Sequence, residues 1–113
     1  TRFVRSQLRG AIFLRADARE ADFTSADLRE TVFTGANLKG AKFVSANLHF
    51  ADLAHADARR ADFSECDFGR ADLHNLRDDG ANYTASQLAL AKRTDPDRLA
   101  AEAFRPPPRP DST

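Results

Sequence analysis

A five-residue period runs through most of this 113-residue chain and constrains its fold more than any other feature. A small residue recurs at every fifth position from 11 to 91, and Ala occupies thirteen of these seventeen positions. Two residues further on, a second register from 3 to 88 holds Phe, Leu or Tyr at fifteen of its eighteen positions. A period of five matches neither an α-helix nor a simple β-strand. The chain is therefore built from a repeated unit, and that unit decides the architecture.

Each unit offers one small and one large apolar residue, two positions apart, and in extended backbone these two face the same side. A sharp turn must follow, because the next unit starts the same pattern again. Four such sides close a square coil of twenty residues. The pattern predicts an all-β solenoid of about four coils, in which aromatic residues spaced by twenty form a core ladder: Phe3, Phe23, Phe43, Phe63 and Tyr83.

The triplets that carry this pattern closely resemble those of the pentapeptide-repeat family. They cover about residues 1 to 83, and examples are Ala36-Asn37-Leu38, Ala46-Asn47-Leu48 and Ala71-Asp72-Leu73. The resemblance implies a right-handed quadrilateral β-helix with both apolar residues of each unit inside. It implies much less about activity, because most members of the family have no assigned function.

Composition narrows the classes of protein that remain. The 17 basic and 17 acidic side chains give no net charge, which argues against direct binding of nucleic acid. No apolar run approaches the roughly 20 residues that span a membrane, and no signal-peptide pattern is visible, so we expect a cytoplasmic protein. The single cysteine, Cys66, excludes an internal disulfide, and its inward position predicts a buried, inert thiol. The chain lacks Met and begins inside a repeat, so we expect that it was processed or cut from something longer.

Four apolar residues are expected on the outer surface. Ile12 and Val32 stand where most units have Asp or Asn, and Leu14 follows Ile12 by two residues. Adjacent coils lie about 4.8 Å apart, so these three side chains should form a small apolar patch. Phe50 also points outward and should extend the patch around a corner. The patch is either a set of scattered surface residues, which are common, or part of a contact surface.

A basic stripe should run outside the fourth side of the stack, where the core is thin because it contains Ala18 and Ala58. Arg19, Lys39 and Arg59 lie twenty residues apart on this side, each two positions after an Asp or Asn. One interpretation is a solvated ladder of weak surface pairs. The other is a docking stripe for an acidic partner.

The repeat is expected to occupy residues 1–84, with a helical cap over 85–104 and a tail over 105–113. Residues 75–80 break the pattern, because Leu76 and Asp78 exchange the expected sizes, so a loop or distorted corner is predicted there. The hydroxyl of Tyr83 should reach water near the end of the stack.

Two short helices are expected to cover the open C-terminal coil. Thr84-Ala85-Ser86-Gln87 matches a capping box and predicts a helix over about 85–93. Asp95-Pro96 predicts the start of a second helix, which runs to about 104. Three apolar residues exceed what one small cap needs to bury and suggest a homodimer through this end: Leu90, Leu99 and Phe104. The Pro-rich tail predicts polyproline II or disorder, either as a solvated tail or as a weak PxxP ligand.

The sequence shows no catalytic constellation, so no enzyme activity and no cofactor are predicted. His55 and His74 should lie near each other on one side, but no carboxylate or thiol stands at ligand spacing, so no metal site is predicted. The recurring Asp residues are interpreted as polar residues that tolerate a turn.

Two functions are consistent with these patterns. The first is a non-enzymatic module for protein interaction or scaffolding, with a protein partner. The second follows from the resemblance, because some members are DNA mimics that modulate DNA gyrase or other type II topoisomerases and confer resistance to quinolones or other topoisomerase inhibitors. Residues 1–90 hold 12 basic and 13 acidic side chains, whereas mimicry of DNA uses an acidic surface.

Overall fold

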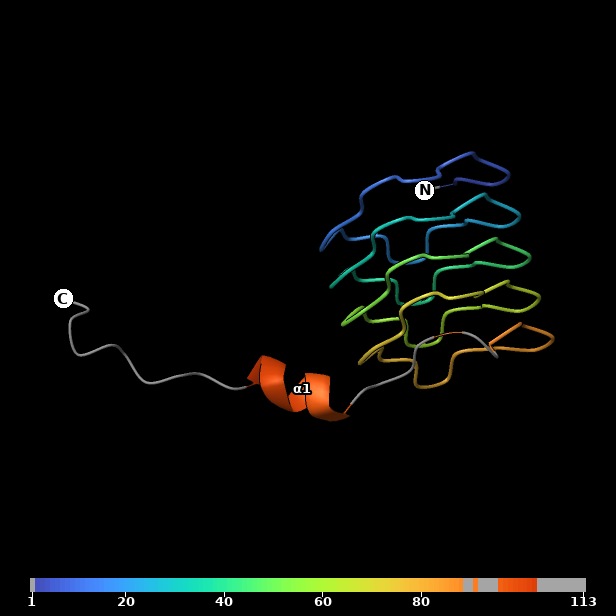
Figure 1. The fold of residues 1–113 in the computed structure, drawn as a ribbon. Helices are drawn as coiled ribbons and strands as arrows, with labels where there is room; N and C mark the ends of the chain where they lie inside the picture. The colour runs from blue at the N-terminus through green and yellow to red at the C-terminus, as the bar shows by residue number, and fades with distance from the viewer. Residues whose placement is uncertain (1, 89–90, 92–95, 104–113) are drawn as a thin grey trace, which may run out of the picture.

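The chain winds into a stack of four-sided coils (Figure 1). The computed structural model describes residues 2–88, 91 and 96–103, apart from the side chains of Leu99 and Ala103. Parallel bridges join residues twenty positions apart, from Arg2 and Asp22 at one end to Asp67 and Gln87 at the other. Each side contributes one bridge per coil rather than a long strand. The sequence prediction of a β-solenoid is therefore confirmed.

Every corner is a tight turn closed by a backbone hydrogen bond. In the turn after Phe23, for example, the N–H of Ala26 donates to the Phe23 carbonyl at 3.0 Å, and Ser25 has φ = 59°. A positive φ at the third residue is the signature of a type II turn. A left-handed conformation costs a residue other than Gly about 1–2 kcal/mol. The ladder bonds offset this cost; the N–H of Ser25 itself donates to the Val44 carbonyl of the next coil at 2.8 Å.

The recurring Asp and Asn residues stabilise these turns through their side chains. The Asp22 carboxylate accepts hydrogen bonds from the N–H and the hydroxyl of Thr24, at 3.0 and 2.5 Å. Every Asp or Asn at this position in residues 2–88 accepts the N–H two residues later, an Asx turn: 17, 22, 27, 37, 47, 52, 57, 62, 67, 72 and 82. The acidic residues therefore have a structural role, as predicted for a turn-tolerant residue.

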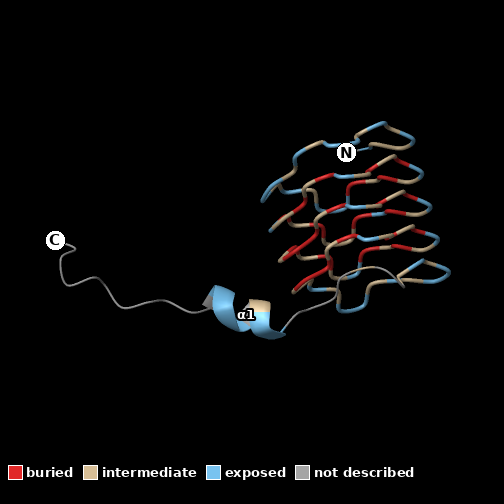
Figure 2. Cartoon of the chain, in the orientation of Figure 1, coloured by how far each residue is buried: buried red, intermediate tan, exposed pale blue. Residues whose placement is uncertain are grey.

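The buried residues run along the inner coils of the stack (Figure 2), and they form one core of small and large apolar side chains. The aromatic rings spaced by twenty stack face to face, with centroids 4.9 to 5.3 Å apart: Phe3, Phe23, Phe43, Phe63 and Tyr83. Phe13 and Phe33 form a second stack at 5.0 Å and meet the first column edge to face. Cys66 is buried, and its thiol donates to the Phe43 carbonyl at 2.6 Å. Burial raises the pKa of this thiol to about 12, so the predicted burial is confirmed and the inertness of the thiol stays a prediction.

The predicted loop at residues 75–80 is wrong, because the coil continues through it. Arg77 bridges Asp57 in the previous coil, and Gly80 adopts φ = 72° at the corner. Asp78 is tolerated at an inward position because the Tyr83 hydroxyl donates to its carboxylate at 2.6 Å. The Tyr83 hydroxyl thus has a protein partner, and whether it also reaches water stays a prediction.

The predicted helix over 85–93 is also wrong where the structure describes it, so the coils extend past the expected boundary at 84. Gln87 bridges Asp67, Ala85 is a left-handed corner with φ = 59°, and Leu88 packs against the core. Ser86 and Leu88 occupy the small and large inward positions. Stacking on the preceding coil gives hydrogen-bond partners to the backbone of this segment and partly buries Leu88. These contacts stabilise the coil more than the capping box would stabilise a helix.

The second predicted helix is present as α1, Pro96–Ala103, with Pro96 at its first position and Asp97 in its first turn. In Figure 1 it lies beside the lowest coils. Its polar contacts reach the side of the stack through Arg98 and Glu102, so it flanks the coils instead of covering the open end. Leu90, Asp95, Phe104 and the tail over 105–113 lie outside the described residues, as does the side chain of Leu99.

Candidate interaction surface

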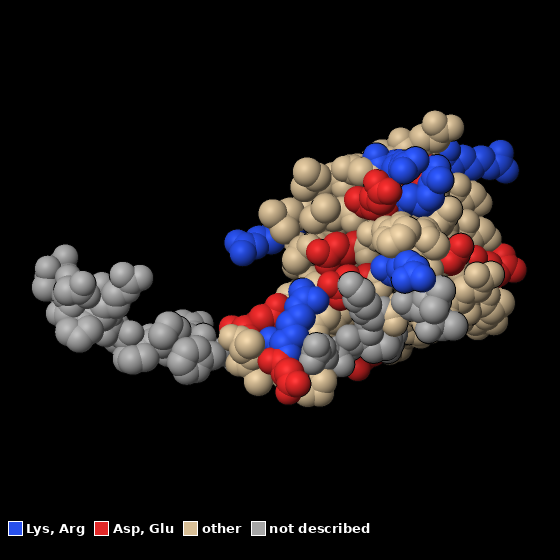
Figure 3. All heavy atoms as spheres, viewed as in Figure 1, with Lys and Arg blue, Asp and Glu red and all other residues tan. Residues whose placement is uncertain are grey.

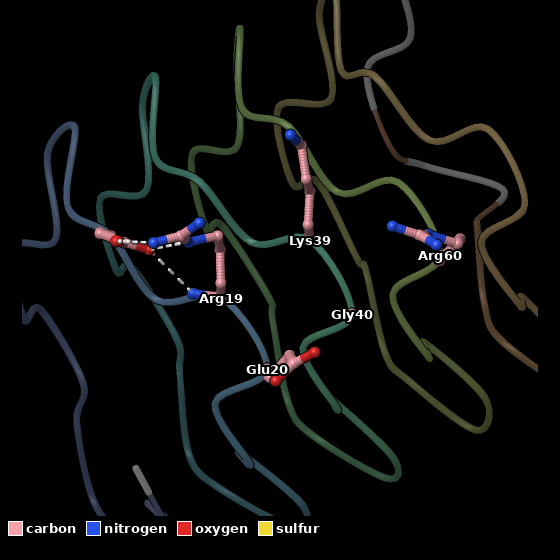
Figure 4. Close-up of a pocket in the computed structure, with 6 residues that line it drawn as sticks. Arg19, Glu20, Lys39, Gly40 and Arg60 are labelled. Carbon is pink, nitrogen blue, oxygen red and sulfur yellow. Dashed lines mark hydrogen bonds and ion pairs between the residues drawn. The ribbon is translucent and has the colours of Figure 1, made fainter.

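The fourth side of the stack is hollowed into an open groove of about 810 Å³ (Figure 4). It is lined by Asp17, Arg19, Glu20, Lys39, Gly40 and Arg60. The groove forms because successive corners stack there and Gly40 has no side chain. A Cβ at Gly40 would lie 3.3 Å from the Glu20 Cγ, so a larger residue would press on the neighbouring coil.

The basic stripe that borders this groove is largely neutralised by its own acidic neighbours. The Arg19 guanidinium binds Asp17 through two hydrogen bonds of 2.9 Å, and Arg59 binds Asp57 in the same way at 2.9 and 2.8 Å. Lys39 Nζ lies 3.7 Å from the Asp57 carboxylate. The hydrogen bonds from Arg59 lower the pKa of Asp57 to about 2. The interpretation as a ladder of surface pairs is thus supported by direct contacts.

Arg60 differs from the other cations of the groove, because it forms no ion pair within residues 2–88. Elsewhere on the surface, acidic and basic side chains are interspersed (Figure 3). Arg29 pairs with Asp27 at 2.7 Å, and Arg9 pairs with Glu30 at 3.2 Å. The face in view therefore presents neither a continuous acidic surface nor a continuous basic one.

A second surface feature is the apolar patch of Ile12, Leu14 and Val32 on the third side of the stack. Ile12 is 73% exposed and Leu14 is 55% exposed, while Val32 is half-buried and bridges Ile12 in the adjacent coil. Neither Ile12 nor Val32 can accept the N–H that an Asp or Asn accepts elsewhere. At two stacked positions the chain therefore forgoes a stabilising hydrogen bond and exposes apolar surface in its place.

Phe50 lies at a corner of the third coil and is 54% exposed. It adopts φ = 61°, and its ring meets the His49 imidazole edge to face at 4.6 Å. His49 in turn covers Gly69, where an added Cβ would clash with the His49 ring. Phe50 therefore packs against His49 at this corner, and its continuity with the patch of Ile12, Leu14 and Val32 stays a prediction.

The third side also carries the contact with α1, two coils below the apolar patch. Arg98 binds the Asp72 carboxylate at 2.8 Å, and Glu102 accepts hydrogen bonds from His74 at 2.6 Å and His55 at 3.1 Å. Hydrogen bonds from His55 and His74 lower the pKa of Glu102 to about 2. The expectation that the two histidines have no carboxylate at ligand spacing is therefore wrong, because Glu102 is distant in sequence but adjacent in space.

This geometry defines a class of protein, a solenoid of square coils stacked on an aromatic ladder. The family model for pentapeptide repeats matches eight copies over residues 1–40 and 41–75, so the chain belongs to the pentapeptide-repeat family. No helix in the described part of the chain is long and apolar enough to cross a bilayer.

Solved structures of the same family resemble this one. A pentapeptide repeat protein from the thylakoid lumen of Arabidopsis thaliana is 29% identical with a TM-score of 0.51, over 84% of this chain and 73% of that chain. One from Nostoc PCC 7120 is 30% identical with a TM-score of 0.49, over 88% and 80%. The lumenal relative shows that the family is not confined to the cytoplasm, so a cytoplasmic location stays a prediction.

QnrB1, a plasmid-mediated fluoroquinolone resistance protein, is also similar in fold. It is 17% identical with a TM-score of 0.43, over 81% of this chain and 65% of that chain. Similarity at this level carries no argument about function. A search among curated proteins found no match.

Proposed function

We propose that this chain is a non-enzymatic, cytoplasmic protein-binding module, and that the apolar patch of Ile12, Leu14 and Val32 is the centre of its contact with a partner protein. One observation carries the proposal. Asp or Asn at this position of the repeat accepts a turn N–H, whereas positions 12 and 32 hold Ile and Val, which cannot accept it. A hydrogen bond to a turn N–H is worth about 0.5–1.5 kcal/mol, so this choice costs stability in the isolated fold.

The groove on the fourth side is a less suitable binding site than the apolar patch, because most of its cations are already paired. Arg19 and Arg59 each already hold a carboxylate through two hydrogen bonds, so an acidic ligand would have to displace Asp17 and Asp57. The same pairing weighs against a mimic of DNA that targets gyrase, because such a mimic needs a continuous acidic face.

The test is a double variant that restores the repeat residue, Ile12→Asn with Val32→Asn. Asn already occupies this position at residues 37 and 47, where its side chain accepts the turn N–H. We expect the double variant to unfold at an equal or higher urea concentration than the parent and to lose its partner in affinity capture from the source cells. Gln7→Asn is the matched control, because it makes the same kind of change on a neighbouring side of the first coil.

Two results would count against the proposal. Equal capture of the same protein by the parent and the double variant would remove the patch from the interface. Dose-dependent inhibition of supercoiling by purified gyrase, unchanged in the double variant, would favour the topoisomerase alternative.

A further inference from the structure

Two imidazoles and one carboxylate converge where α1 meets the stack. The His74 Nε2 lies 2.6 Å from one oxygen of Glu102, and the His55 Nε2 lies 3.1 Å from the other. The two imidazole rings are nearly perpendicular, with centroids 5.2 Å apart. One ligand atom from each residue lies within 4.8 Å of the other two.

The repeat itself does not require either histidine. The residues that stack in the same column as His74 are Leu14, Thr34 and Ala54. His55 stands at a left-handed corner with φ = 61°, where Gly or Asn is favoured and where the coils above and below have Gly35 and Asn75.

Burial sets these groups apart from ordinary surface residues. His74 is only 1% exposed, and its Nε2 is directed at the Glu102 carboxylate. A buried polar group needs a partner, and this one is supplied by a helix that begins more than twenty residues later in the chain.

We propose that His55, His74 and Glu102 bind a divalent transition-metal ion, with Zn²⁺ the best fit, and that this ion fastens α1 to the side of the β-helix. Two imidazole nitrogens and one carboxylate oxygen form a known type of zinc ligand set that leaves a fourth position for water. Imidazole nitrogen also suits Cu²⁺ and Ni²⁺, whereas Mg²⁺ and Ca²⁺ prefer oxygen ligands.

The geometry needs only small side-chain adjustments to accept an ion. With bonds of about 2.0–2.1 Å, the ligand atoms of a tetrahedral zinc site lie about 3.3 Å apart. The 2.6 Å between the His74 Nε2 and the Glu102 Oε1 therefore has to open by less than 1 Å. The remaining separations, which are at most 4.8 Å, have to close by at most about 1.5 Å.

Neighbouring polar groups fit the same arrangement. The Asn75 side-chain nitrogen lies 3.0 Å from the His55 Nδ1. A flip of this amide would bring its oxygen to the same place, where it accepts the Nδ1–H once Nε2 holds the metal. The Arg98 Nε lies 3.3 Å from the Glu102 Oε2, and its positive charge disfavours binding of a metal ion close to that oxygen. Its stronger contact is with Asp72 at 2.8 Å, and the Glu102 Oε1 beside His74 is the oxygen available to the ion.

An ion at this place would change how α1 is held. α1 has eight residues, and an isolated helix of this length is unstable in water. Because a metal ion bound only by the docked form stabilises that form, docking of α1 would become dependent on the metal concentration.

The experiment uses the full chain without a histidine tag, freed of metal by a chelator and titrated with ZnCl₂ in a calorimeter. We expect one Zn²⁺ per chain, and at least about tenfold weaker binding in His74→Gln, His55→Gln and Glu102→Gln. His49→Gln is the matched control, because it changes the remaining histidine, which lies on a different side and contacts Phe50. Co²⁺ in place of Zn²⁺ should give the visible absorption of a tetrahedral site in the parent and the control.

The proposal is overturned if the parent shows no saturable zinc binding, or if a folded His55→Gln, His74→Gln double variant binds Zn²⁺ as tightly as the parent. If the buried change at His74 prevents folding, Glu102→Gln decides between the outcomes, because the Glu102 side chain is 36% exposed and its replacement leaves the core intact. Unchanged zinc affinity in folded Glu102→Gln would equally refute the proposed ligand set.

Discussion

The aromatic ladder offers a direct test of how the stack is held together, through the substitution Phe43→Ala. Phe43 is fully buried, and its ring stacks at 5.0 Å on Phe23 above and on Phe63 below. Phe33 meets the same ring edge to face at 5.9 Å. Truncation to Ala removes three ring contacts and leaves a void in the middle of the stack.

The cost should lie near the upper end of the range for such changes. Phe→Ala substitutions in cores cost about 3–5 kcal/mol, and the value rises when the site cannot collapse. Here collapse is opposed by the ladder bonds that hold the coils apart, such as the N–H of Phe43 donating to the Asp62 carbonyl at 2.7 Å. We therefore expect about 4–5 kcal/mol of lost unfolding free energy.

Urea unfolding followed by circular dichroism and by Tyr83 fluorescence measures this loss. Phe50→Ala is the control, because the Phe50 side chain is 54% exposed and its removal should change stability by less than about 0.5 kcal/mol. A midpoint for Phe43→Ala within error of the parent would refute the stacked-column model of the core.

Four further outcomes follow from the structure and sequence. Burial of Cys66 raises the pKa of its thiol to about 12, so the native protein should react very slowly with a thiol reagent. Unfolding in urea exposes the thiol and should make it reactive, and fast labelling of the native protein would contradict this prediction. Ala58→Phe should cost roughly 1–3 kcal/mol by overpacking the thin fourth side, measured as a lower urea midpoint, because Ala58 is fully buried. The pKa of Asp57 falls from 3.8 to about 2 in the folded state, so its pairing with Arg59 stabilises the protein above pH 3.8 and this stabilisation is lost as the pH falls toward 2. The difference in unfolding free energy between the parent and Asp57→Asn should therefore vanish between these two pH values. A difference that stays constant with pH would contradict this prediction. Self-association through the C-terminal end stays a prediction, which light scattering of the parent and Phe104→Asp tests, since a monomeric parent would exclude a dimer.

Much of the fold followed from the sequence because it depends on a local rule repeated many times. Residues spaced by twenty must stack once each unit turns a corner, so the positions of Phe43 and Cys66 in the core could be derived from register alone. The exposure of Ile12 and Leu14 followed from the same rule. Even the structural role of the Asp residues could be anticipated, although the bond from each side chain to a turn N–H became visible only in three dimensions.

The features that the register does not govern were decided by tertiary contacts. Asp78 looked like a break, and the hydrogen bond from the Tyr83 hydroxyl to its carboxylate helps to accommodate it. Gln87 looked like part of a helix cap, and it continues the coil because the preceding coil offers a ladder partner. Glu102 meets His55 and His74 across separations of 47 and 28 residues, and no periodic pattern relates these positions. Periodicity determines the neighbours of a repeated unit, whereas the docking of a single short helix depends on the three-dimensional match between its side chains and one particular face of the stack.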